Sequence, residues 1–442
     1  MDNQASELLE KIRQQFNNAP YPRIPLEASP KNDFNSLYTH NIVTSFYLRN
    51  QQIIDPQGKM ILDAGCGTGF KSLILSEANP GAKVVGIDIS EKSIELARKR
   101  LDYHGFDQAE FHTLSIHDLA KLGYQFDYIN CDETLYLLPD PITALKAMKS
   151  VLKPNGIIRA NLHNSTQRAE VYRAQKVFTM MGLRDESPGD LEVELVIEMM
   201  QALKNNVNIK DTTWNFNYQG EELKGMVLIN YLLQGDKGYT IPEMFTFLNL
   251  AELEFINMVD WRKWDLMTLF KEPDNLPAFL GMSLPEISLE EKLQIFELLH
   301  PVHRLLDFWC GHPQEAQIFV SPAEWTHSDW QEVTVYLHPQ LKIPQFKTDL
   351  LASIKESRIF PISKYLSQIE EFICIDSSMA ICLIDLLDHP QSLMSIVERW
   401  KQYRPIDPVT LHSMDTEQAL PLVQKILLTL EDFGCLLLER QV

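Results

Sequence analysis

The chain has few basic residues for its length, and this shortage limits what it can bind. Its 442 residues include 40 lysines and arginines against 60 aspartates and glutamates, so the formal net charge is −20. Non-specific nucleic-acid binding needs lysine and arginine to displace counterions from phosphates, and the sequence has no strong cluster of either. We therefore expect neither nucleic acid nor an anionic membrane surface as a partner.

Segments that would place the chain in a membrane or outside the cell are also missing. No uninterrupted apolar run reaches the length of a membrane-spanning helix, and the start of the sequence lacks a signal-peptide pattern. The six cysteines have neither the spacing of a disulfide framework nor that of a standard zinc finger. The sequence therefore predicts a reduced, cytoplasmic protein without a bound metal.

What the chain does have is enough apolar material for a large core. It is 45% hydrophobic and 10% aromatic, which argues against extensive disorder. Because its length exceeds that of a usual single domain, we expect two or three modules.

Two apolar stretches that end in polar loops form the main motif. Residues 61–69 read ILDAGCGTG, and residues 84–90 read VVGIDIS. Glycine lets the backbone turn with positive φ and lets a ligand lie against the main chain. Asp88 is placed to accept hydrogen bonds from ribose hydroxyls, as an acid about twenty residues after the glycine loop does in dinucleotide folds. Together the stretches predict a nucleoside pocket at the carboxyl edge of a parallel sheet.

Departures from the dinucleotide pattern indicate which nucleoside derivative is bound. The loop reads G-x-G-x-G with an aspartate just before it, whereas dinucleotide sites need G-x-G-x-x-G. Asp63 would repel a pyrophosphate but suits a ligand with an ammonium and a sulfonium. The string DAGCGTG resembles the cofactor loop of class I S-adenosylmethionine-dependent methyltransferases.

This resemblance implies S-adenosyl-L-methionine as cofactor and a role for each part of the motif. Asp63 would lie near the methionine end, the glycines would back the cofactor, and Asp88 would hold the ribose. Where many relatives place an acid near the adenine, this chain has Ser115, so we expect the Ser115 hydroxyl and the Ile116 backbone there. The expected cofactor-binding residues are Asp63, Gly65, Cys66, Gly67, Gly69, Asp88, Ile89, Ser115, Ile116, Asn130 and Tyr38.

Strand and helix patterns alternate from residue 60 to residue 162. We expect strands at 60–63, 83–88, 109–113, 126–132 and 156–162, with helices at 69–78, 91–104 and 141–152. Such alternation gives parallel βαβ units with right-handed crossovers. A sixth strand near 252–261 and a seventh near 316–320 would complete a Rossmann-like, doubly wound, seven-stranded α/β sheet. Helical insertions are expected at about 166–238 and 263–312.

Three regions follow from these patterns. Residues 1–59 should form helices at 6–18 and 36–52, joined by a proline-rich strap, NAPYPRIP, that resembles leaders folding over the cofactor in some methyltransferases. Residues 60–325 should form the methyltransferase domain. Residues 330–442 should form a mainly α, winged-helix-like domain with helices at 375–388, 391–403 and 417–433. Acidic residues outnumber basic ones there, so a protein contact or a homodimer surface is expected rather than DNA.

The acceptor side of the site is expected at the ends of the fourth and fifth strands. In class I methyltransferases the tip of the fourth strand faces the transferable methyl group, so the resemblance makes Asn130, Asp132, Glu133 and Tyr136 the first candidates for catalytic residues. His163, after the fifth strand, is a candidate proton acceptor. A lysine acceptor, with a pKa of about 10.4, must lose its proton before it attacks.

Three functions remain open from the sequence. The overall plan resembles bacterial methyltransferases with an appended regulatory domain, a group that includes protein lysine methyltransferases. This favours methyl transfer to a protein side-chain nitrogen, lysine or amide, with the C-terminal domain docking the protein substrate. The alternatives are a small-molecule N- or O-methyltransferase and a cofactor-binding regulatory protein without catalysis.

Overall fold

A computed structural model describes residues 3–313, 320–366, 372–407 and 409–440. By its internal contacts the chain divides into two compact units. The first comprises residues 1–28, 58–76 and 82–314, and the second comprises residues 29–57, 77–81 and 315–442. The expected strap, sheet and insertions thus fall in the first unit, whereas the expected helical region at 36–52 groups with the C-terminal residues.

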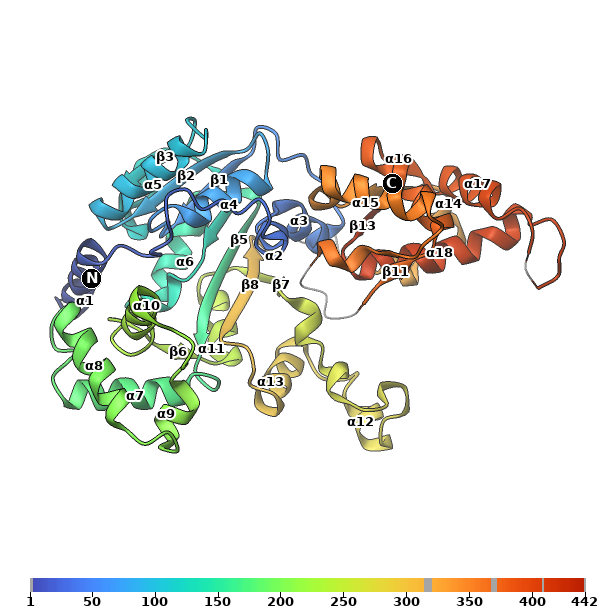
Figure 1. The fold of residues 1–442 in the computed structure, drawn as a ribbon. Coiled ribbons are helices and arrows are strands. Elements are labelled where there is room, and N and C mark those ends of the chain that lie inside the picture. Colours follow the sequence, from blue (N-terminus) through green and yellow to red (C-terminus); the bar gives the residue numbers. More distant parts are fainter. Residues whose placement is uncertain (1–2, 314–319, 367–371, 408, 441–442) are drawn as a thin grey trace. The chain divides into compact units, whose positions relative to one another are not determined.

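A mostly parallel sheet forms the centre of the first unit (Figure 1). Its strand order is β3-β2-β1-β4-β5-β8-β7, and the short β6 pairs with the end of β5. Strands β1 to β5 run parallel, and β8 runs antiparallel to both β5 and β7. The strands are β1 (Met60–Ala64), β2 (Lys83–Asp88), β3 (Glu110–Thr113), β4 (Phe126–Cys131), β5 (Leu152–Asn164), β6 (Gly238–Tyr239), β7 (Glu254–Met258) and β8 (Leu305–Gly311).

This order confirms the predicted Rossmann-like, doubly wound sheet, and the first five strands lie where they were expected. The partner of β7 is different from the prediction. It is β8, Leu305–Gly311, whereas residues 316–319 of the expected strand lie outside the described residues. Phe308, Trp309 and Cys310 in β8 are buried, and the strand is paired on both edges, with β5 and with β7.

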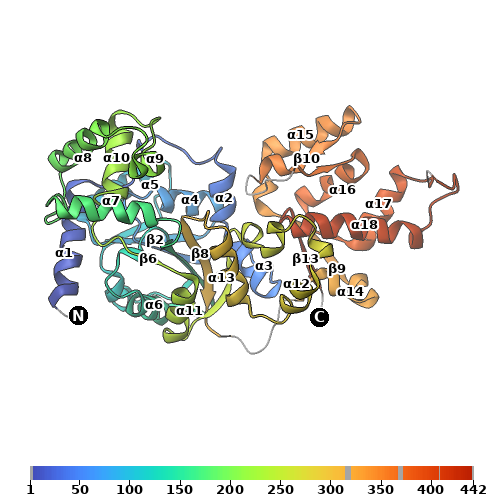
Figure 2. The ribbon, with the colours of Figure 1, turned by 90° about the horizontal axis from the view of Figure 1, so that it is seen from below.

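Helices of the first unit cover the sheet and form the two insertions. Figure 2 shows α6 and α11 side by side, in agreement with their direct contacts. The first insertion, α7 to α10, has its own apolar core, which includes Phe178, Val196 and Tyr231. The helices are α1 (Asn3–Asn18), α4 (Phe70–Ala78), α5 (Glu91–Tyr103), α6 (Pro141–Ser150), α7 (Ala169–Met180), α8 (Asp190–Ala202), α9 (Asn208–Thr213), α10 (Gly220–Asn230), α11 (Ile241–Leu250), α12 (Ala278–Ser283) and α13 (Leu289–Leu299).

The second insertion is shorter than predicted. Its helices α12 and α13 are preceded by short 3-10 turns, among them η3 (Trp261–Trp264) and η4 (Leu266–Leu269). The insertion ends before β8, because residues 305–311 extend the sheet and do not continue the helices. No helix among the described residues combines the length and the apolar character needed to cross a membrane.

The second unit combines helices with a three-stranded antiparallel sheet of order β12-β9-β13. The predicted C-terminal helices are confirmed as α16, α17 and α18, whereas the expected helix at 36–52 is two helices. Asn41 separates them, because its side chain accepts a hydrogen bond from the N–H of Val43 and caps α3. The elements are α2 (Phe34–Thr39), α3 (Ile42–Asn50), α14 (His327–Gln331), β9 (Val333–Leu337), α15 (Pro344–Lys355), β10 (Phe360–Pro361), β11 (Cys374–Ile375), α16 (Ser377–Asp388), β12 (Gln391–Ser392), α17 (Leu393–Tyr403), α18 (Thr416–Asp432) and β13 (Leu436–Arg440).

Candidate active site

The glycine-rich loop connects β1 to α4 and has a backbone shape that favours glycine. Gly65, Gly67 and Gly69 have φ angles of 84°, 52° and 81°. A Cβ on Gly67 would lie 2.3 Å from the carbonyl oxygen of Tyr21. Glycine is therefore needed here both for the turn and for the close approach of another segment.

That other segment is the proline-rich strap. The backbone N–H of Thr68 donates to the Tyr21 carbonyl at 3.1 Å, and the Thr68 hydroxyl donates to the Pro22 carbonyl at 2.8 Å. Arg100 of α5 donates to the carbonyls of Ile24 and Pro25. The strap thus lies against the glycine loop, and its role as a cover for the cofactor remains a prediction.

Asp63 and Asn130 come together at the carboxyl ends of neighbouring strands. The register of β1 and β4 places them opposite each other, and Asn130 Nδ2 donates to Asp63 Oδ1 at 2.9 Å. The other carboxylate oxygen of Asp63 accepts from the Ser72 hydroxyl at 2.6 Å. Burial raises the pKa of Asp63 to about 6, so this carboxyl titrates close to neutral pH.

Asp88 lies at the end of β2 and is held by backbone amides. Its carboxylate accepts from the N–H of Gly67 at 3.0 Å and from the N–H of Ser90 at 2.8 Å. Burial raises the pKa of this carboxyl. Asp88 therefore lies directly beside the glycine loop, and Ile89 follows it with its side chain packed against the core of the sheet.

The other predicted cofactor residues have identifiable structural surroundings. Ser115 caps the 3-10 helix η1 (Ile116–Leu122), because its hydroxyl accepts from the N–H of His117. Ile116 and Cys66 are buried, and burial raises the pKa of the Cys66 thiol well above its usual range. Tyr38 belongs to the second unit, where its ring packs on His338 with centroids 4.7 Å apart. The contacts predicted between these residues and the cofactor remain predictions.

The end of β4 holds a second pair of carboxylates. Asp132 Oδ2 lies 2.8 Å from Nζ of Lys71, a residue at the start of α4. Asn161 of β5 binds both residues of the pair, donating to Asp132 Oδ1 at 2.5 Å and accepting from the N–H of Glu133 at 2.8 Å. Glu133 has a φ of 55°, which is unusual for a residue other than glycine. Strain of this kind is found at sites where neighbours fix a side chain in place.

His163 is held at the end of β5 by a carboxylate and an aromatic ring. Its Nδ1 lies 2.6 Å from Oδ1 of Asp236, and its ring stacks on Tyr136 with centroids 3.6 Å apart. Nε2 lies 3.0 Å from NH1 of Arg304. A guanidinium can only donate hydrogen bonds, so Nε2 accepts and the proton is on Nδ1.

His163 is therefore neutral, with a lone pair on Nε2 directed at Arg304. Burial lowers the pKa of His163, although the hydrogen bond to Asp236 acts in the opposite direction. Such a histidine can take a proton from the group that is to be methylated. Asp236 would stabilise the imidazolium that results.

Arg304 joins His163 to Glu133. Its guanidinium donates two hydrogen bonds to the Glu133 carboxylate, which also accepts from the Tyr136 hydroxyl at 2.7 Å. Burial raises the pKa of Glu133, but the charge and the hydrogen bonds of Arg304 outweigh burial and lower it overall. Both side chains remain partly exposed, Arg304 at 46% and Glu133 at 32%.

Arg159 completes the row of charged groups on the neighbouring strands. It lies in β5 with only 4% of its side chain exposed, and its NH2 lies 2.6 Å from Oδ2 of Asp307 in β8. It also donates to the amide oxygen of Asn130 at 3.3 Å. All five predicted catalytic residues thus belong to one connected network, which runs along the ends of β4, β5 and β8.

Several members of this network were not found from the sequence. Asp236 follows α10 in a loop, Arg304 precedes β8, and Lys71 lies in the first turn of α4. Asp236 and Arg304 stand outside any motif, so nothing in the local sequence marks them. Among the described residues, histidine, cysteine, aspartate and glutamate form no group of three or more that could hold a metal ion.

The residues around the glycine loop fit the predicted cofactor. The positive φ angles of Gly65, Gly67 and Gly69 turn the loop tightly, and Asp63 and Asp88 lie on either side of it. Carboxylates at these positions suit the ammonium and the ribose hydroxyls of S-adenosylmethionine.

Comparison with known proteins agrees with this geometry. A family model described as "Methyltransferase domain" matches residues 55–228. An uncharacterized protein of Synechococcus is 27% identical over 317 residues, which cover 70% of this chain and 72% of that protein. A ubiquinone biosynthesis O-methyltransferase of Pasteurella multocida is 36% identical over 151 residues, and the match covers 32% of this chain and 60% of that enzyme.

Solved structures show the same fold over nearly the whole chain. PKMT2 from Rickettsia typhi in complex with AdoHcy has a TM-score of 0.58 and 18% identity, and the match covers 96% of this chain and 78% of that one. A second structure of PKMT2 from Rickettsia typhi has a TM-score of 0.57 and 17% identity. Residues 55–228 therefore hold a methyltransferase domain, and the glycine loop and the sheet order are those of the class I S-adenosylmethionine-dependent methyltransferase fold.

Proposed function

We propose that the protein transfers a methyl group to a protein side-chain nitrogen, and that a lysine amine is the acceptor. The position of Arg304 carries this proposal. Its guanidinium contacts the carboxylate of Glu133 and Nε2 of His163 at the same time. A cation is therefore accommodated between a negative charge and a base, as an incoming lysine ammonium would have to be.

The roles of the residues follow from this arrangement. The lysine ammonium displaces Arg304, pairs with Glu133, and gives one proton to Nε2 of His163. Asp236 keeps the proton on Nδ1 before this step and stabilises the imidazolium after it. S-Adenosylmethionine supplies a methyl group on a sulfonium, so the C–S bond breaks as the C–N bond forms.

The extent of the fold similarity also supports a protein acceptor. The fold similarity to PKMT2 extends over 96% of this chain, so it includes the second unit as well as the methyltransferase domain. We propose that the second unit, which we interpret as winged-helix-like, docks the protein substrate, with homodimerisation as its alternative use.

The cytoplasm is the proposed location, because the cysteines lack the spacing of a disulfide framework.

A small-molecule acceptor is the second candidate. It is favoured by relatives named ubiquinone biosynthesis O-methyltransferase, among them those of Pasteurella multocida and Haemophilus ducreyi, of which the match covers 60% and 48%. His163 would then take the proton of a hydroxyl. Because a hydroxyl brings no positive charge, Glu133 would stay paired with Arg304.

Radiolabelling separates these candidates. The purified full-length protein is incubated with S-adenosylmethionine labelled in its methyl group and with a lysate, and labelled proteins are separated from labelled small molecules. Acid hydrolysis of the protein fraction should then release labelled methyllysine. His163→Gln should lose this labelling while binding the cofactor normally in calorimetry. Label confined to small molecules would overturn the proposal.

A further inference from the structure

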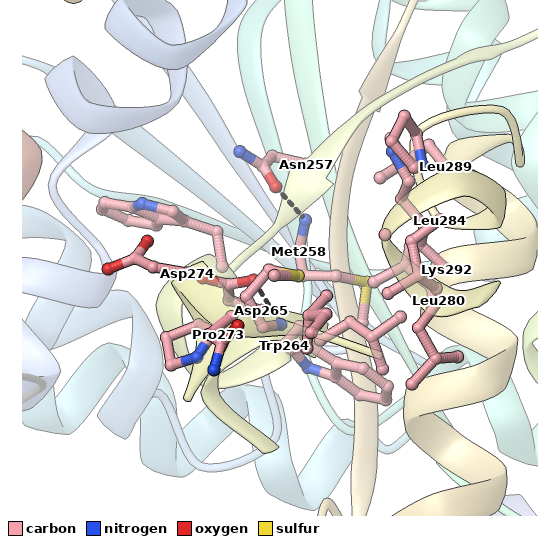
Figure 3. A pocket seen from close by; sticks show the side chains of 18 residues that line it. Asn257, Met258, Trp264, Asp265, Pro273, Asp274, Leu280, Leu284, Leu289 and Lys292 are labelled. Atoms are coloured by element: carbon pink, nitrogen blue, oxygen red, sulfur yellow. Dashed lines mark hydrogen bonds between the residues drawn. The ribbon is translucent and has the colours of Figure 1, made fainter. Parts of the chain in front are cut away.

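A cavity of about 710 Å³ lies in the second insertion of the first unit, next to the end of β7 (Figure 3). Its size falls within the range of ligand-binding pockets, about 300 to 1,000 Å³. In Figure 3, Leu280, Leu284 and Leu289 lie across the cavity from Met258 and Trp264. The cavity is thus formed between the carboxyl end of β7 and the helices α12 and α13.

The lining of the cavity is largely apolar. Met258, Trp264 and Leu284 are buried and supply large side chains. Among the polar residues, Asp265 is engaged in capping η4, where it accepts from the N–H of Met267 at 2.9 Å. An occupant would therefore be held by burial of apolar surface.

Apolar side chains continue from the cavity onto the surface of α12. Leu280 and Gly281 of this helix line the cavity, and its Phe279 and Met282 are each 77% exposed. A small molecule enclosed in the cavity would leave these two side chains in water. Exposed apolar residues beside a pocket are typical of a surface that binds another protein.

A ring contact links the cavity to the residue that precedes Arg304. The ring of Trp264, which lines the cavity, stacks on His303 with centroids 4.4 Å apart. His303 directly precedes Arg304, which contacts Glu133 and His163. An occupant of the cavity would therefore lie on the same edge of the sheet as the transferred methyl group.

We infer that this cavity docks several large apolar side chains of the protein segment that carries the methyl acceptor. The inference rests on the proposed function and assigns a second contact to the same substrate. The cavity volume holds more than one side chain, Phe279 and Met282 extend the contact, and the net charge of −20 disfavours an anionic membrane as the occupant.

Gly281 offers a matched pair of variants for the test. A Cβ added at Gly281 meets nothing within 4 Å, so Gly281→Ala fits without a clash, and Gly281→Trp places a large side chain at a position that lines the cavity. Gly281→Ala leaves the cavity open, whereas the indole of Gly281→Trp fills part of it. Each full-length variant is incubated with methyl-labelled S-adenosylmethionine and a series of lysate concentrations, and initial labelling of the protein fraction is measured.

We expect Gly281→Trp to label protein at least tenfold more slowly than Gly281→Ala at low lysate concentration, and the difference should shrink as lysate is added. Cofactor affinity in calorimetry and the unfolding midpoint should be the same in both variants. Equal labelling by the two variants would overturn the docking inference and leave the proposed function intact. Labelling of small molecules alone would overturn both.

A second pair of variants tests the surface side chains. Phe279→Ser and Met282→Ser should slow protein labelling as well, because they remove apolar contact without filling the cavity. Cosedimentation of the unmodified protein with phosphatidylcholine vesicles should show no binding. Vesicle binding that these two substitutions abolish would mean that the surface contacts a lipid bilayer, and it would overturn the inference.

Discussion

Nδ1 of His163 lies 2.6 Å from Oδ1 of Asp236, although 73 residues separate them in the chain. This contact, together with Arg304 at Nε2, fixes a neutral histidine with its proton on Nδ1. Nitrogen-15 NMR of the histidine-labelled protein should therefore show a protonated Nδ1 and an unprotonated Nε2 at neutral pH. A proton on Nε2 would contradict the role of His163 as a base.

Replacing Asp236 should slow methyl transfer. In Asp236→Asn, Arg304 still requires Nε2 to accept, but the carboxylate that would stabilise the imidazolium is lost, so we expect methyl transfer to fall by about 10²-fold. Asp236 also pairs with the buried Arg168 at 3.1 Å, so the variant should unfold more easily, by about 3 to 5 kcal/mol. Labelling rates at a temperature where the variant is folded separate the two effects. An unchanged rate there would exclude a positioning role.

Removing Arg304 should change the pH dependence of stability. In Arg304→Met the charge and hydrogen bonds that outweigh burial are lost, so the pKa of Glu133 should rise. A carboxyl with a lowered folded-state pKa stabilises the fold above its ordinary pKa, and this contribution is lost as pH falls. The variant should therefore be less stable than the wild type at pH 7, and the deficit should shrink below the ordinary pKa of 4.5.

The control for this experiment is Arg173→Met, which breaks an exposed ion pair with Glu170 in α7. Exposed pairs contribute about 0 to 1 kcal/mol, so this variant should follow the wild type at every pH in urea unfolding. A deficit for Arg304→Met that does not depend on pH would mean that Arg304 acts through packing alone.

Asp63 should change stability with pH in the opposite direction to Glu133, because its pKa is raised and not lowered. Its folded-state pKa is raised from 3.8 to about 6 by burial, so the folded state holds its proton more tightly than the unfolded chain. Stability from this group is fully present below about pH 4 and is lost as pH rises to about 6. Relative to the wild type, Asp63→Asn should gain about 3 kcal/mol between those limits. Parallel unfolding curves at all pH values would contradict the raised pKa.

The strap can be tested with two glycines that share a positive φ. In Gly67→Ala the new Cβ would lie 2.3 Å from the Tyr21 carbonyl, whereas at Gly105, with a φ of 82°, it meets nothing within 4 Å. Both variants carry backbone strain, but only Gly67→Ala should displace the strap. Hydrogen exchange should then increase at Thr68, and cofactor affinity should fall. The same exchange pattern in both variants would exclude a specific contact with the strap.

Cofactor binding itself is tested at Asp88. Asp88→Ala should weaken S-adenosylmethionine binding by about 1 to 3 kcal/mol, the usual cost of leaving buried hydrogen-bonding groups without a partner. Asp107→Ala, on an exposed turn after α5, should bind normally in the same calorimetric titration. Normal binding by Asp88→Ala would mean that the ribose lies elsewhere.

Some parts of the fold could be predicted from the sequence because their signals are local. The first five strands and the C-terminal helices have clear apolar periodicity, and Asn41 is a local cap that explains the break between α2 and α3. The position of β8 could not be predicted in the same way. Leu305–Gly311 is a mixed stretch whose place between β5 and β7 depends on partners that are distant in the sequence.

The sequence by itself predicted a cofactor site and the local structure around it, because Gly65, Gly67 and Gly69 are required by local backbone angles and Asp63 and Asp88 lie at the ends of adjacent strands. The tertiary structure alone brought together the residues of the proposed acceptor side. Asp236 and Arg304 reach His163 from 73 and 141 residues away, and a carboxylate or guanidinium gives no sign of its partner until the chain path brings the two together. Long-range side-chain contacts of this kind leave no periodicity or spacing in the sequence, and the proposed role of His163 as a base rests on them.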